Sequence, residues 1–192
     1  ISEYGNFLAI AAVPTWGGGN SRIFLWDRDT TTATLSESID AGSGVIMVME
    51  EVDGFLIAIS QKGGTSTSHS GLPNGSVSFR DRLYFRYLTG NRMEKLMEIT
   101  ANHAGSANTL KLPVAKQKVD NRLYFMMTLE LNGAVRSGVW SFGRSSPAAP
   151  FVLIHERTIS NDTAIVTGDL INNFIVVGDY MFLSWQVNGG DF

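Results

Sequence analysis

The sharpest polar pattern in this 192-residue sequence is formed by Arg80, Arg82, Tyr84 and Arg86. These residues stand at every second position, so a β-strand over the segment would place their side chains on one face. Three guanidinium groups beside a phenol could bind a phosphate, a sulfate, a sugar acid or an acidic protein surface. The segment is our candidate binding site. The alternative is an exposed strand whose arginines cover apolar surface with their stems.

The sequence around these residues is basic. Residues 80–122 contain nine Lys and Arg against four Asp and Glu, a net charge of +5, whereas the whole chain has a net charge of −3. Two interpretations stay open: the basic segment neutralises acidic parts of the same fold, or it faces an acidic partner. The sequence contains no nucleic-acid-binding motif.

Trp16 is a second candidate binding residue. It precedes three glycines, in a segment that predicts a flexible turn, and its ring could stack on a sugar or pack into the core. Other residue types that could perform chemistry are scattered. His69, His103 and His155 lie far apart with no second ligand at metal-binding spacing, and the chain has no Cys. We therefore expect no metal, no cofactor and no catalytic residues.

Short runs of β-branched and aromatic residues dominate the chain and predict strands. Asp53-Gly54 and Gly178-Asp179 each separate two apolar runs and predict two-residue hairpins. Periodicity leaves residues 93–100 open between helix and strand. The strands are expected over residues 6–12, 22–27, 45–50, 55–60, 76–88, 122–131, 139–142, 151–159, 173–177 and 180–186.

Three sections of the chain follow one plan of strands and turns. Their aromatic residues Trp26, Tyr87 and Trp140 stand 61 and 53 residues apart. A repeat of this length with four strands per unit is typical of β-propeller blades. We expect a single all-β domain over residues 1–192, with units near 1–60, 61–131 and 132–192, as part of a longer chain. The alternative is a β-sandwich.

The strand starts at residues 52–58, 119–125 and 178–183 resemble those of β-propeller repeats. The resemblance covers nearly the whole chain and implies about three to four four-stranded antiparallel blades. Ser38-Ile39-Asp40-Ala41-Gly42 is similar in part to the Asp-box of sialidase-like propellers, which is an element of the fold and not of catalysis. The Gly-, Ser- and Thr-rich composition without Cys is similar to that of structural proteins of bacteriophage tails and necks.

Two functions follow from this sequence as expectations. The first is a non-enzymatic structural or interaction module that contacts other protein chains in an assembly such as a virion tail or neck. The alternative is a sialidase-like propeller that binds or hydrolyses glycans through Trp16 and the arginine face. No apolar run reaches the 18 residues of a membrane span and no signal peptide is recognisable, so we expect no membrane contact. The sequence leaves the location of the protein open, and our expectation is a virion or extracellular location.

Overall fold

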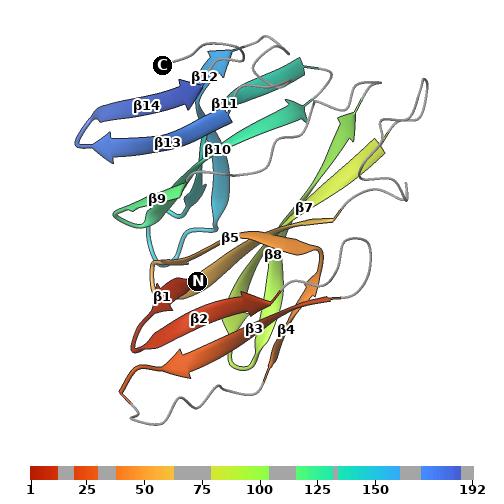
Figure 1. The fold of residues 1–192 in the computed structure, drawn as a ribbon, viewed down its shortest axis with the longest axis vertical. Helices are drawn as coiled ribbons and strands as arrows, with labels where there is room; N and C mark the ends of the chain where they lie inside the picture. The colour runs from red at the N-terminus through yellow and green to blue at the C-terminus, as the bar shows by residue number, and fades with distance from the viewer. Residues whose placement is uncertain are drawn as a thin grey trace. The chain divides into compact units, whose positions relative to one another are not determined.

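The part of the chain that the computed structural model describes is all-β. It comprises residues 1–12, 20–29, 38–62, 79–103, 116–131, 134–160 and 170–186. Fourteen strands in these residues form four antiparallel sheets, three with four strands and one with two (Figure 1). These sheets confirm the predicted fold class of four-stranded antiparallel blades. The described residues include no helix long and apolar enough to cross a membrane.

The chain divides into two compact units. The first unit comprises Ile1–Thr67 and Arg82–Thr100, and the second comprises Ser68–Asp81 and Ala101–Phe192. Two four-stranded sheets belong to the first unit, apart from the ends of two strands. The first sheet contains β1 (Ser2–Tyr4), β2 (Phe7–Ala12), β3 (Asn20–Asp27) and β4 (Ile39–Ser43). The second sheet contains β5 (Val45–Val52), β6 (Phe55–Lys62), β7 (Phe79–Thr89) and β8 (Arg92–His103).

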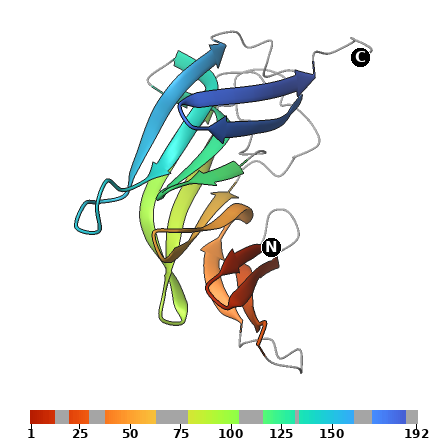
Figure 2. The ribbon, with the colours of Figure 1, turned by 90° about the vertical axis from the view of Figure 1, so that its left-hand side faces the viewer.

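The second unit contains the other two sheets. The third sheet contains β9 (Lys116–Val119), β10 (Arg122–Leu131), β11 (Ala134–Gly143) and β12 (Val152–Ser160). The fourth is a hairpin of β13 (Leu170–Val177) and β14 (Tyr180–Gln186), which Figure 2 shows in dark blue. In every sheet the strands are neighbours in the order of the chain. This up-and-down order is that of a propeller blade.

The turns that the sequence predicts are present. Asp53 and Gly54 join β5 to β6 with φ angles of 51° and 78°, the left-handed values of a two-residue type I′ turn. Gly178 and Asp179 join β13 to β14, and in this two-residue turn only Gly178, with φ 57°, has a positive φ. Residues 93–100, which periodicity left open, lie on β8. The predicted strand residues 76–78 lie outside the described part.

Within each unit the two sheets meet at their first strands. In the first unit β1 contacts β5, where the backbone N–H of Gly5 donates to Glu51 Oε2 at 2.9 Å. In the second unit β9 contacts β13. Neighbouring first strands are the arrangement that adjacent blades of a propeller have.

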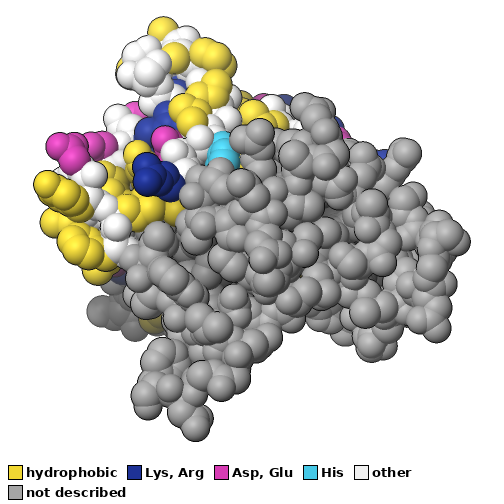
Figure 3. Space-filling model, turned by 90° about the horizontal axis from the view of Figure 1, so that it is seen from above, with side chains coloured by type: hydrophobic (Ala, Val, Ile, Leu, Met, Phe, Trp, Pro, Cys, Tyr) yellow, Lys and Arg dark blue, Asp and Glu magenta, His cyan; other side chains and the backbone are white. Residues whose placement is uncertain are grey.

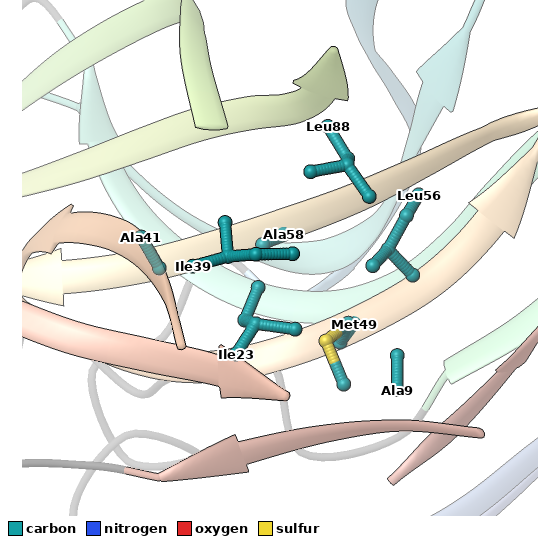
Figure 4. Packing of buried hydrophobic residues seen from close by; sticks show 8 residues of the cluster. All are labelled: Ala9, Ile23, Ile39, Ala41, Met49, Leu56, Ala58 and Leu88. Carbon is teal, nitrogen blue, oxygen red and sulfur yellow. The ribbon is translucent and has the colours of Figure 1, made fainter. Parts of the chain in front are cut away.

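The first unit has a hydrophobic core between its two sheets. Its members come from β2, β3 and β4 of one sheet and from β5, β6 and β7 of the other (Figure 4). They are Ala9, Ile23, Ile39, Ala41, Met49, Leu56, Ala58 and Leu88. Each sheet therefore buries one apolar face against its neighbour, which a single small sheet cannot do alone.

Aromatic side chains pack within the third sheet, in the second unit. Phe125 and Trp140 are buried, and the ring of Trp140 lies 4.6 Å from that of His155. Phe142 is also buried and stacks on Phe151, with 5.4 Å between ring centres. His155, one of the three histidines considered as metal ligands, is thus a packing residue.

Candidate functional site

The predicted binding residues lie on β7, next to β8. Arg82, Tyr84 and Arg86 lie side by side on one face, as their spacing predicts. Arg80 lies on β7 as well, but its side chain is outside the described part. Trp16 is wholly outside it.

Of the three side chains Arg82, Tyr84 and Arg86, the outer one, Arg82, is part of a charged surface. The side chain of Arg82 is 54% exposed, and its Nη1 lies 3.5 Å from Glu98 Oε1 on β8. Lys95 Nζ donates to the other carboxylate oxygen of Glu98 at 2.8 Å. This hydrogen bond is the largest cause of the lowered pKa of the Glu98 carboxyl. The positive charges of Lys95 and Arg82 lower the pKa further. Glu98 therefore stays ionised between two cations.

The inner end of the group is buried. Arg86 is 7% exposed, and its guanidinium lies 4.4 Å from the centre of the Tyr84 ring, which is equally buried. Arg86 Nη1 donates to Ser60 Oγ on β6 at 2.5 Å. Burial lowers the pKa of Arg86, and the nearby Tyr84, Asp40 and Glu98 oppose that change.

The two ends of the group have different chemistry. Arg82, Lys95 and Glu98 form a solvated surface that an anionic partner could contact, whereas Tyr84 and Arg86 are part of the packing. Lys95 Nζ also lies 6.0 Å from the Tyr84 ring centre, so two cations, Arg86 and Lys95, lie near this ring. Among the described residues no cluster of His, Asp and Glu could hold a metal ion.

A second surface, which the sequence did not single out, lies on the hairpin of β13 and β14. Four large side chains of the hairpin are exposed: Ile175 (49%), Val177 (59%), Tyr180 (73%) and Phe182 (59%). Ile175 pairs with Phe182, and Val177 pairs with Tyr180. Directly paired residues point to the same face of a sheet, so all four form one surface, the hairpin face.

Hydrophobic side chains reach the surface in several groups on the described part of the molecule, as the view from above shows (Figure 3). The hairpin face differs from scattered apolar residues because its members are adjacent pairs on two strands. Contiguous apolar patches of this kind mark interaction sites more often than single exposed residues do. The turn Gly178-Asp179 fixes these pairs, so the sequence contained the signal for this surface.

The outer edge of β13 is occupied by a side chain of β9. Gln117 Nε2 donates to the carbonyl oxygen of Val176 at 3.0 Å, and the backbone N–H of Val176 donates to Gln117 Oε1. The amide of Gln117 thus satisfies the same backbone groups that a neighbouring strand would satisfy.

Comparisons of the chain with protein-family models, with curated proteins and with solved structures return no match.

Proposed function

We propose that the protein is a non-enzymatic interaction module, made of sheets like the blades of a β-propeller, that contacts other protein chains in a larger assembly such as a virion tail or neck. The observation that supports this proposal is the hairpin face, formed by Ile175, Val177, Tyr180 and Phe182. Tyr and Phe are enriched in protein interfaces, where a large apolar ring is buried.

Burial of the hairpin face would be favourable. Removing one such side chain from water contributes about 1.5–3 kcal/mol when burial is complete, so four half-exposed side chains offer a partner several kcal/mol. Among the described residues the fourth sheet has two strands, and a two-stranded sheet is marginally stable in water by itself. A partner that covers the face would stabilise both the complex and the hairpin.

The surroundings of Tyr84 support a role without catalysis. A phenol that attacks a substrate must be accessible, and Tyr84 is 7% exposed beneath the guanidinium of Arg86. Arg82 interacts with Glu98 on the neighbouring strand. The glycan-active alternative would need these groups around an open site.

The proposal is tested by photo-crosslinking in the assembled particle. A benzophenone amino acid replaces Phe182 in the full-length protein, and a matched variant carries it at Leu96, an exposed apolar residue on β8. We expect crosslinks to another protein chain from position 182 and not from position 96. Equal crosslinking from both positions, or none from position 182, would contradict the proposal.

A further inference from the structure

The first unit has a basic surface, formed by Arg82 on β7 and Lys95 on β8. Their side chains are 54% and 53% exposed. Glu98 lies between them, with one carboxylate oxygen 2.8 Å from Lys95 Nζ and the other 3.5 Å from Arg82 Nη1. The second distance exceeds the roughly 2.7–3.2 Å of an ordinary hydrogen bond. Arg82 is therefore drawn to Glu98 by charge, and its guanidinium can still donate to another carboxylate.

The charges around Glu98 do not balance. The pKa of this carboxyl is lowered first by the hydrogen bond from Lys95 and then by the charges of Lys95, Arg82 and Arg86, so three cations face one carboxylate. Arg86 is 7% exposed and donates to the neutral hydroxyl of Ser60. Within the described part of the chain it forms no ion pair. A buried cation without a carboxylate partner is unfavourable, so a further anion nearby would be stabilising.

Asp40 on β4 is the other carboxylate whose charge acts on Arg86. Its Oδ1 accepts a hydrogen bond from the N–H of Gly42 at 2.7 Å, and its Oδ2 accepts one from the side-chain amide of Asn20 at 2.9 Å. These bonds are the largest causes of the lowered pKa of Asp40, and the charge of Arg22 adds to them. With Arg22 and both carboxylates counted, four cations face two anions, and the positive excess remains.

We propose that Arg82 and Lys95 bind the carboxylates of an acidic segment in a partner chain. Glu98 shows that the two cations can share a carboxylate, and both are exposed enough for an external one to reach them. A guanidinium binds a carboxylate through two parallel hydrogen bonds. Because the two cations lie on neighbouring strands, an extended segment with several acidic side chains can contact both. The inference rests on the proposed function, since it gives the chemistry of a partner.

The ring of Tyr84 supports the basic surface. This ring is buried, and its centre lies 6.0 Å from Lys95 Nζ and 4.4 Å from Cζ of Arg86. Cations are attracted to the face of an aromatic ring. The ring thus helps to hold Lys95 in place independently of Glu98, so the surface should persist when the Glu98 carboxylate is removed.

Titration of the purified protein with a hexaglutamate peptide at low ionic strength tests the site, with the NMR shifts of the β7 and β8 amides as the readout. We expect saturable shifts with hexaglutamate and none with hexaglutamine. Arg82→Gln or Lys95→Met should each weaken binding about two- to fivefold, because each removes an exposed charge. Arg92→Gln is the matched control on β8. It should weaken binding less than about 1.5-fold, since Arg92 already pairs with Glu94.

Glu98→Gln gives a test that misfolding cannot imitate. The substitution removes the carboxylate that competes for Arg82 and Lys95, so hexaglutamate should bind about two- to fivefold more tightly. Glu94→Gln changes the net charge equally on the same strand and pairs with a different arginine. It should tighten binding less than about 1.5-fold.

Two results would overturn the inference: no binding of hexaglutamate to the unaltered protein, or equal effects of Glu98→Gln and Glu94→Gln. Sodium sulfate that shifts the same amides where hexaglutamate does not would overturn the acidic segment as the ligand. The crosslinks expected from position 182 do not depend on Arg82 or Lys95. Failure of this inference is therefore distinguishable from failure of the proposed function.

Discussion

Gly42 and Arg86 are so close that a Cβ atom on Gly42 would lie 3.0 Å from Cζ of the guanidinium. Gly42 is on β4 of the first sheet, and Arg86 is on β7 of the second. The guanidinium also donates a hydrogen bond to Ser60 Oγ on β6. Arg86 therefore connects the two sheets of the first unit, and this is a role within the fold.

Gly42→Ala should destabilise the first unit by about 2 kcal/mol or more. The φ of 77° is unfavourable for alanine, and the new methyl group would push the guanidinium away from Ser60. In an Arg86→Ala background the same change should cost only about 1–2 kcal/mol, the backbone strain alone. Urea unfolding of the four proteins of this double-mutant cycle measures the difference. Additive effects would contradict the contact between the two residues.

Lys95→Met should raise the pKa of the Glu98 carboxyl toward its ordinary value, because the hydrogen bond from Lys95 Nζ is the largest cause of its lowering. Arg82→Gln should raise the pKa of Glu98 less, since Arg82 contributes only charge. Because the pKa of Glu98 is lowered in the folded protein, its ion pairs stabilise the fold at pH values above the pKa of the unfolded carboxyl. This stabilisation is lost as the pH falls through the pKa of the folded protein. NMR titration of the Glu98 carboxyl measures both variants. A larger shift in Arg82→Gln would refute the order of these causes.

Gly138→Ala should destabilise the second unit severely, by about 3 kcal/mol or more. A Cβ at this position would lie 2.0 Å from the backbone oxygen of Arg157 on β12, where β11 and β12 are out of regular register. Gly5→Asn is a suitable control, because φ is 54° there and the space is open. Thermal unfolding should show a large loss for Gly138→Ala and a small one for Gly5→Asn. Similar losses would mean that the close approach to Arg157 is not decisive.

The purified protein should hydrolyse no sialosides, other glycosides, esters or phosphate esters. The reason is that Tyr84 and Arg86 are buried in packing and hydrogen bonds between strands. Turnover that Tyr84→Phe abolishes without loss of folding would refute this prediction and favour the glycan-active alternative.

Much of the fold could be predicted from the sequence, because it depends on local patterns. Asp53-Gly54 and Gly178-Asp179 form the hairpin turns that their residue types favour. Trp26, Tyr87 and Trp140, the basis of the predicted repeat, lie on β3, β7 and β11, which are the third strands of their sheets. Residues 93–100 were ambiguous because exposed residues such as Leu96 interrupt the alternation.

The candidate site could be predicted only in part. Strand parity placed Arg82, Tyr84 and Arg86 on one face, but it could not say that Arg86 is buried, since that burial depends on Gly42 in another sheet. The pairs of the hairpin face follow from the turn at Gly178. The exposure of these pairs depends on the whole fold.

The most direct test of the interaction role is an electron-microscopy map of the particle that contains this protein. The proposal predicts density of another protein chain over Ile175, Val177, Tyr180 and Phe182. A hairpin face open to solvent in the complete assembly, with the only bound molecule at Arg82 and Lys95, would contradict it.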